Sequence, residues 1–228
     1  MKLESTKIQS FIAISDGISL MNMICGFISI ILAINHEFSL SAILMIVAIM
    51  FDSVDGWVAR KINRNDELKF GKNIDSLSDA ISFGAAPATF LYTLSETIPN
   101  NISILSILVS LLMVVCGILR LTRYNVIADH IETQDFIGFP IPGIAIILAT
   151  YYLSGLFNLY IALPLLAITS LLMISNVKYP KFNNKIIIGI SVVLIVLIPF
   201  NISLLNINIP GLILMLFSLY YLIVNLIK

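Results

Sequence analysis

The sequence predicts an all-α integral membrane protein with about eight transmembrane helices. Three observations lead to this fold class. Hydrophobic residues make up 59% of the 228 residues, and the mean hydropathy is +1.02. Long apolar runs recur along the chain, and no polar stretch between them is long enough to fold a soluble domain. Lysine and arginine occur only at the chain ends and in alternate connections between the runs. The net charge of zero gives no sign of nucleic-acid binding.

The apolar runs predict the individual helices. They cover residues 18–35, 39–56, 74–95, 102–121, 140–156, 158–176, 186–200 and 209–227. Crossing the hydrocarbon core takes roughly 20 residues, so several of these runs are short and their boundaries are approximate. A short interval around Asn158 separates the fifth helix from the sixth. Residues 1–17 are expected to form a short interfacial helix that turns apolar side chains toward lipid: Leu3, Ile8, Phe11 and Ile12.

The cationic residues predict the orientation. All 13 lie at the two ends of the chain or in the even-numbered connections: Lys2, Lys7, Arg60, Lys61, Arg64, Lys69, Lys72, Arg120, Arg123, Lys178, Lys181, Lys185 and Lys228. Positive connections stay on the cytoplasmic side. We therefore expect a multi-pass protein of the plasma membrane with both termini and the connection after residue 56 in the cytoplasm. An odd number of helices would break this pattern.

Four aspartates stand where membrane helices meet this polar side: Asp52, Asp55, Asp75 and Asp79. Carboxylates in such positions cost free energy, and four of them side by side cannot all stay ionised unless cations neutralise them. Hard oxygen ligands suit Mg²⁺, Mn²⁺ or Ca²⁺ rather than Zn²⁺. Two divalent ions would balance four charges and could clamp a pyrophosphate.

The spacing of these aspartates predicts a helical hairpin that gathers them. Asp52 and Asp55 are three residues apart on a helix that continues to Ile62, and Gly56 and Ala59 share their face. Small residues beside carboxylates leave room for a ligand near the backbone. Asp75 and Asp79 are four apart on the next helix, with Gly71 one turn earlier. The polar segment between the two helices is expected to form the turn.

These residues resemble the signature of the CDP-alcohol phosphatidyltransferase family, D-x2-D-G-x2-A-R-x8-G-x3-D-x3-D. The spacer from Arg60 to Gly71 holds ten residues here in place of eight. The resemblance implies a core of six helices, residues 18–180, around a cytoplasmic cavity, followed by two extra helices in residues 181–228. It also implies a CDP-linked lipid donor and, often, a homodimer in the membrane.

The same resemblance implies the site residues. Two divalent cations, Mg²⁺ or Mn²⁺ with Ca²⁺ as a possible occupant, would be held by Asp52, Asp55, Asp75 and Asp79. Asp79 would also be the general base. The nucleotide and its phosphates would contact small and basic residues: Gly56, Ala59, Arg60, Gly71 and Lys72. The family often has Asn at the position of Asn22. The resemblance leaves open whether Asn22 contacts the nucleotide.

Further stretches resemble the phosphatidylserine synthase branch of the family. Residues 120–125 match R-L-x-R-[FY]-N, and residues 136–142 match F-x-G-[LF]-P-x-P. The branch implies L-serine as acceptor, with Arg120, Arg123 and Asn125 binding serine or phosphate. The two arginines, one helical turn apart, could hold a carboxylate, or could be ordinary flanking charges. The prolines and glycines of 138–143 exclude regular helix there and should bring backbone close to the cavity.

Other functions are open at this point. A sibling enzyme would use inositol phosphate or glycerol 3-phosphate, which carry a phosphate and no amine. A transporter would place its carboxylates near the midplane and show internal repeats, and neither is seen. A purely structural protein gives no reason for the aspartate spacing. The sequence does not distinguish acyl-ester chains from archaeal ether-linked chains on the donor.

Overall fold

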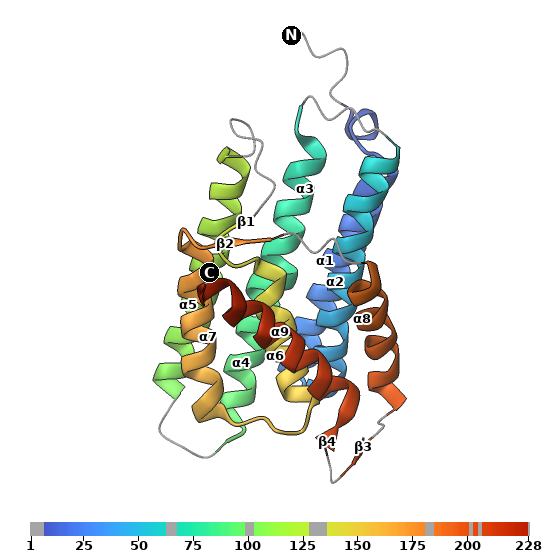
Figure 1. Ribbon diagram of the computed structural model, residues 1–228. Coiled ribbons are helices and arrows are strands. Elements are labelled where there is room, and N and C mark those ends of the chain that lie inside the picture. Colours follow the sequence, from blue (N-terminus) through green and yellow to red (C-terminus); the bar gives the residue numbers. More distant parts are fainter. Residues whose placement is uncertain are drawn as a thin grey trace.

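A computed structural model describes residues 7–62, 68–98, 103–127, 136–180, 185–200, 203–204 and 207–227. Within these residues the fold is helical (Figure 1). The main helices are α1 (Ile14–Ile34), α2 (Phe38–Lys61), α3 (Phe70–Asp79), α4 (Ala86–Glu96), α5 (Ser103–Ile127), α6 (Ile141–Leu153), α7 (Leu159–Ile174), α8 (Lys185–Leu197) and α9 (Ile209–Ile227). Short 3₁₀ turns lie at η1 (Ile8–Ser10) and η3 (Ile198–Phe200).

The third expected helix has an internal irregularity. A π-helical segment, η2 (Ala80–Ala85), joins α3 to α4, so the chain is helical without a break from Phe70 to Glu96. Each predicted apolar run is thus confirmed as a helical segment, including the pair α6 and α7. The largest boundary difference is at α5, which continues to Ile127, beyond the predicted end at 121. Consequently Arg123 and Asn125 lie on this helix.

The expected interfacial helix in residues 1–17 is wrong for the part that the structure describes, residues 7–17. In residues 7–17 the structure has a three-residue 3₁₀ turn at Ile8–Ser10 and then α1 from Ile14, not a separate helix. Phe11 is half-buried and stacks on Phe70, with ring centroids 5.4 Å apart, so this side chain packs inward at the start of α3. Leu3 lies outside the described residues.

In the described connections, two short antiparallel ladders lie between helices. β1 (Phe136–Ile137) pairs with β2 (Lys178–Tyr179), and β3 (Ser203–Leu204) pairs with β4 (Ile207–Asn208). After β1, Gly138 has φ of +81°, and α6 begins at Ile141 with a proline in its first turn. Residues 138–140 are therefore non-helical, as expected, but Pro142 and Gly143 are already helical, which corrects the predicted extent of this loop.

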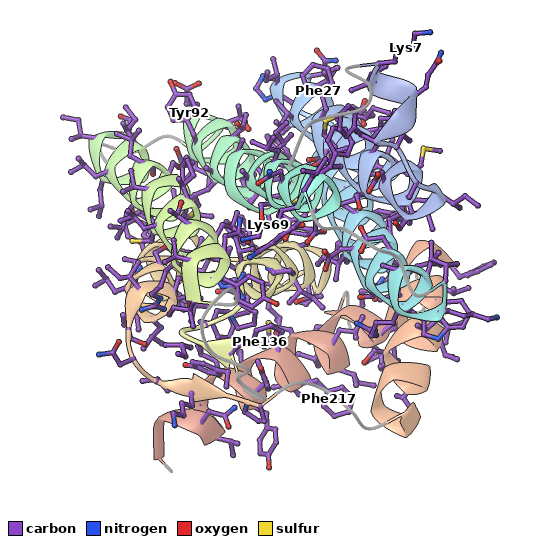
Figure 2. All side chains as sticks on the ribbon, turned by 90° about the horizontal axis from the view of Figure 1, so that it is seen from above. Lys7, Phe27, Lys69, Tyr92, Phe136 and Phe217 are labelled. Atoms are coloured by element: carbon purple, nitrogen blue, oxygen red, sulfur yellow. The ribbon has the colours of Figure 1, made fainter. Side chains whose placement is uncertain are left out.

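The outside of the bundle is apolar. Figure 2 shows side chains rich in carbon pointing outward around the perimeter, including Phe27 and Phe217. These two rings are 56% and 44% exposed. Among the residues that the structure describes, three helices, α1, α2 and α5, are long and apolar enough to cross a membrane. Such a surface needs lipid around it, because exposed apolar area of this extent is not stable in water.

Helices meet inside the bundle through small residues. Ala33, Ala42, Ala145 and Ala162 are completely buried. Small side chains allow the close backbone approach that stabilises helix pairs in lipid. α1 packs against α2, α3, η2 and α4, and α9 crosses over α6 (Figure 1). The packing of α1 matters for the site, because this helix touches both aspartate-bearing helices.

Candidate active site

Three of the four predicted aspartates form one compact cluster. Asp52, Asp55 and Asp75 each contribute a carboxylate oxygen, and these oxygens all lie within 4.8 Å of one another. The first two belong to the last turns of α2, and Asp75 to the middle of α3. The structure therefore brings the two helices of the expected hairpin together at this point, although the turn itself, residues 63–67, lies outside the described residues.

Asp79 joins the cluster from the last position of α3. It is 6% exposed, and its carboxyl group is in hydrogen-bonding contact with that of Asp52. Two carboxylates in contact repel unless a proton or a cation lies between them. The four acids thus form one electrostatic unit, with Asp79 deeper in the protein than the half-buried Asp52 and Asp75.

The cluster fits a divalent cation. One oxygen of Asp75, Oδ1, is buried and has no hydrogen-bond partner. A buried carboxylate oxygen without a donor is costly, and a cation would satisfy it. The donor set is all oxygen and carries several negative charges, which suits Mg²⁺, Mn²⁺ or Ca²⁺.

Helix α1 supplies donors to two of these aspartates. Ser19 Oγ donates to Asp55 Oδ2 at 2.6 Å, and Asn22 Nδ2 donates to Asp79 Oδ1 at 3.1 Å. Sequence reasoning gave Ser19 no role and considered Asn22 only for the nucleotide. The available signal was a stripe of small and polar residues every three or four positions in an otherwise apolar helix: Ser15, Ser19, Asn22, Gly26 and Ser29.

The predicted nucleotide residues lie beside the cluster on α2. Gly56 and Ala59 are half-buried and Arg60 is exposed. A Cβ atom built on Gly56 would meet only Arg60 Nη1 within 4 Å, at 3.5 Å. This face of α2 therefore has open space next to a guanidinium group, as a phosphate-bearing ligand requires.

Gly71 and Lys72 are in the first turn of α3. Gly71 is buried, and Lys72 Nζ donates to the backbone carbonyl of Asn125 at 2.6 Å. The Asn125 side chain completes this link between α5 and α3, because its Nδ2 donates to Ser76 Oγ at 2.8 Å. Its Oδ1 is buried without a partner, so Asn125 retains a free acceptor near the cluster.

Arg120 faces the aspartates from α5. Its side chain is 6% exposed, and its positive charge acts on Asp52, Asp75 and Asp79. The guanidinium carbon lies 5.5 Å from the ring centroid of Tyr124 and 5.6 Å from that of Phe136. Arg120 Nε has no hydrogen-bond partner. A buried, stacked guanidinium with a free donor is well suited to bind a carboxylate or phosphate.

Arg123, expected beside Arg120 as a ligand for serine or phosphate, has a different set of contacts. Its Nη1 donates to the carbonyl of Ile174 at 2.9 Å. Its Nη2 donates to the carbonyls of Ile137 and Met173 at 2.8 and 2.9 Å. Arg123 thus ties α5 to the end of α7 and to β1. The two arginines point to different neighbours although they are only one turn apart.

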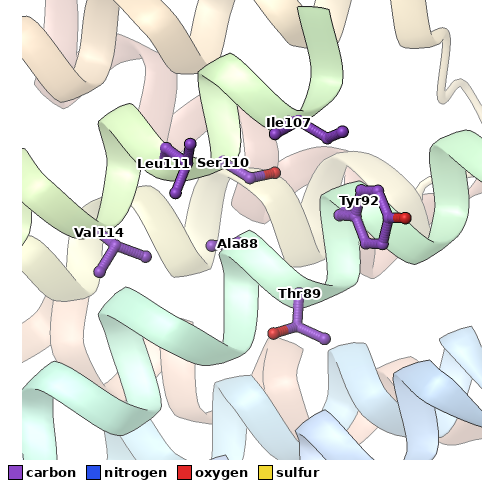
Figure 3. Close-up of a pocket in the computed structure, with 7 residues that line it drawn as sticks. All are labelled: Ala88, Thr89, Tyr92, Ile107, Ser110, Leu111 and Val114. Carbon is purple, nitrogen blue, oxygen red and sulfur yellow. The ribbon is translucent and has the colours of Figure 1, made fainter. Parts of the chain in front are cut away.

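A groove elsewhere in the molecule lacks such chemistry. It lies between α4 and α5 with a volume of about 290 Å³, and its lining is mostly apolar (Figure 3): Ala88, Thr89, Tyr92, Ile107, Ser110, Leu111 and Val114. Its lining contains no ionisable group other than the Tyr92 phenol. Ala88 is nine residues beyond Asp79 along the helical column, so the groove is separate from the acidic cluster.

Comparison with known proteins identifies the class. A family model for CDP-alcohol phosphatidyltransferases matches residues 12–197, a range that holds the four aspartates and Arg120. The chain belongs to the CDP-alcohol phosphatidyltransferase family, whose members are transferases.

Several curated proteins resemble the chain over most of its length. The archaetidylserine synthase of Methanothermobacter thermautotrophicus is 44% identical over 179 residues, covering 78% of this chain and 74% of that protein. The CDP-diacylglycerol–serine O-phosphatidyltransferase of Methanocaldococcus jannaschii is 40% identical over 184 residues, covering 80% and 81%. The enzyme of that name from Bacillus subtilis is 31% identical over 172 residues, covering 72% and 88%.

Proposed function

We propose that the protein transfers the phosphatidyl-type group of a CDP-linked lipid to the hydroxyl of L-serine and releases CMP. The observation that carries this proposal is the buried Arg120, with its free Nε, next to the aspartate cluster. Serine offers a carboxylate for a guanidinium, an ammonium for acceptors such as Asn125 Oδ1, and a hydroxyl for a base. The names of the relatives in archaea and bacteria agree with this acceptor.

In the proposed reaction the serine hydroxyl oxygen attacks the phosphorus attached to the lipid. The bond from that phosphorus to the bridging oxygen breaks, and CMP leaves with the electron pair. Asp79 accepts the hydroxyl proton, since it is buried and its carboxylate is held by Asn22. Arg120 holds the serine carboxylate, and Arg60 and Lys72 lie near the nucleotide phosphates. Gly56 and Ala59 leave space for the nucleotide. Gly71 is proposed to lie beside the nucleotide as well.

Two divalent cations, Mg²⁺ or Mn²⁺, are proposed at Asp52, Asp55, Asp75 and Asp79. When bound, they would neutralise the pyrophosphate and the charge that develops during displacement. Oxygens of Asp52, Asp55 and Asp75 lie within 4.8 Å of one another, while Asp79 contacts Asp52. Arg123 is no longer proposed as a substrate ligand, because three backbone carbonyls already occupy its guanidinium.

The location and assembly are also proposals. The N-terminal end of α1, the end of α2, the start of α3 and the end of α5 all lie at one end of the bundle (Figure 1). The cationic connections join these ends, so we place them, both termini and the site in the cytoplasm, at the plasma membrane. A homodimer in the membrane is proposed from the family resemblance. Membrane lipids are proposed to contact the apolar perimeter.

An acceptor panel tests the proposed reaction. Purified protein with Mn²⁺ or Mg²⁺ is given CDP-archaeol or CDP-diacylglycerol and one radiolabelled acceptor: serine, glycerol 3-phosphate or inositol phosphate. We expect labelled lipid with serine only, and CMP in equal amount. The two donors distinguish ether-linked from ester-linked chains. Labelling by either phosphate-bearing acceptor, with none from serine, would contradict the acceptor assignment.

A further inference from the structure

Asn22 is the one α1 residue that bonds both to Asp79 and to the π-helical segment after it. Its side chain is completely buried, and its Nδ2 donates to Asp79 Oδ1 at 3.1 Å. Its backbone carbonyl accepts a hydrogen bond from Ser82 Oγ at 3.0 Å. One residue of α1 therefore holds the carboxylate of Asp79 and also the π-helical segment that follows this aspartate.

The π-helical segment η2 begins immediately after Asp79 and is docked on α1 at Gly26. A Cβ atom at Gly26 would lie 2.5 Å from Ser82 Cα, closer than any real contact. The absence of a side chain at Gly26 lets the two backbones meet. π-Helical turns are rare and occur often at functional sites. Here the segment places Ser82 against α1, one turn beyond Asp79, so that Asp79 faces Asn22.

The chemistry of the amide suits orientation of the Asp79 carboxylate. Nδ2 is already engaged with Asp79, and the other amide atom, Oδ1, is buried with no partner. A neutral amide neither removes the charge of Asp79 nor takes its proton. By donating to Oδ1 of Asp79, Asn22 fixes the plane of the carboxyl group beside Asp52.

We propose that Asn22 is a positioning residue that holds the Asp79 carboxylate in its reactive orientation, with Ser82 and Gly26 fixing the approach of α1. This inference rests on the proposed function in that it takes Asp79 as the base. It replaces the expectation that Asn22 contacts the nucleotide. Fixing a base by a neighbouring hydrogen bond affects the chemical step more than substrate binding.

The test compares Asn22→Ala and Asn22→Asp with Ser29→Ala. Aspartate keeps the shape of asparagine but replaces the N–H donor with an acidic oxygen. Ser29 is a matched control, because it is on α1, is completely buried, and bonds to Ser41 of α2 away from the aspartates. For each protein the kcat for CMP release, the KM of serine and of the CDP-lipid, and the affinity for CDP with Mn²⁺ are measured.

We expect both Asn22 variants to lose kcat by about 10- to 100-fold, as is typical when an outer-shell partner is removed. Both KM values and the CDP affinity should stay within about threefold of wild type. Ser29→Ala should keep its kcat. A parallel fall in CDP affinity would make Asn22 a nucleotide contact and overturn the proposal. A kcat near wild type in Asn22→Asp, or an equal loss in Ser29→Ala, would also overturn it.

This outcome is separable from a failure of the proposed function. If wild-type protein labels lipid with glycerol 3-phosphate or inositol phosphate but not with serine, the serine assignment fails. The same variants are then compared by CMP release with the acceptor that works. Asn22→Asp has nearly the volume of the native residue, so it gives the answer if Asn22→Ala does not fold.

Discussion

Arg120 and Arg123 show how two identical side chains one turn apart acquire different tasks. Arg120 is 6% exposed and has a free Nε beside the aspartates. Arg123 donates to three carbonyls at the end of α7 and in β1. We propose that the first receives the substrate carboxylate, whereas the second joins three segments of the fold. Next to it, Gly138 leaves room for the Arg123 guanidinium, because a Cβ there would collide with Nη2.

This difference predicts opposite effects of two equivalent substitutions. Arg120→Lys should raise the KM of serine by about tenfold or more, because a point charge replaces a planar fork, while thermal stability changes little. Arg123→Lys should lower the free energy of unfolding by about 2 kcal/mol through lost charge-assisted hydrogen bonds. For a chain of this size that corresponds to a fall in melting temperature of roughly 4–8 °C.

Serine-dependent kinetics and thermal unfolding in detergent measure the two effects on the same preparations. Each variant serves as the control for the other. The interpretation fails if Arg123→Lys raises the KM of serine while its melting temperature stays at the wild-type value.

At this scale the sequence predicted the acids but not the residues that orient them. Asp52 and Asp55, and Asp75 and Asp79, are related by helical spacing, which can be read directly from the chain. The bonds from Ser19 to Asp55 and from Asn22 to Asp79 link residues 36 and 57 positions apart. Such contacts depend on how α1 lies against α2 and α3, which no local pattern specifies. For the same reason Arg123 could not be distinguished from Arg120 beforehand.

At the scale of elements, the helices were predictable because lipid exposure produces long apolar runs. The residues at which the helices end were harder to predict. α5 continues to Ile127, since Arg120 and Arg123 find partners in the protein and the helix need not stop at its first charge. The π-helical segment η2 has no sequence pattern that separates it from α-helix, and its Ser82 lies against Gly26 of α1.

The close approach of α1 and η2 predicts that Gly26→Ala is severe. The added methyl group cannot fit within 2.5 Å of Ser82 Cα, so the two backbones must separate and the Asn22–Asp79 bond must lengthen. We expect CMP release to fall by more than about tenfold. Gly17→Ala is the matched control on the same helix, because nothing lies within 4 Å of its added carbon, and it should retain full activity.

Activity and melting temperature are measured for both glycine variants. Wild-type turnover in Gly26→Ala would show that activity does not depend on the distance between α1 and η2. It would contradict the explanation of Gly26 as the residue that allows this close approach.

At the scale of the whole molecule, an apolar bundle places its polar chemistry at one end. The family match ends at residue 197, which is also the last residue of α8, and α9 lies beyond it. α9 packs on α6, and Tyr221 donates from its hydroxyl to the carbonyl of Pro180 at 2.9 Å. Tyr179 and Tyr221 also pack together, with ring centroids 5.6 Å apart. α9 thus supports the β1–β2 ladder, whose Phe136 contacts Arg120.

The one-sided distribution of cations predicts a fixed orientation. In a variant lacking Cys25 and Cys116, a cysteine at Lys61 should react with a membrane-impermeant maleimide only from the cytoplasmic side. A cysteine at Glu37 should react only from the opposite side. Both positions are exposed at opposite ends of α2, so each is the control for the other. The reverse labelling pattern would invert the proposed topology.

The most direct test of the central claim is CMP release by Asp79→Asn with CDP-lipid, serine and Mn²⁺. The matched control is Glu96→Gln, since Glu96 is an exposed carboxylate at the far end of the same helical column. Loss of a general base should reduce turnover by about 100- to 10,000-fold, while at least part of the CDP binding remains and Glu96→Gln stays fully active. Full turnover in Asp79→Asn would contradict the assignment of the base and, with it, the proposed working of the aspartate cluster.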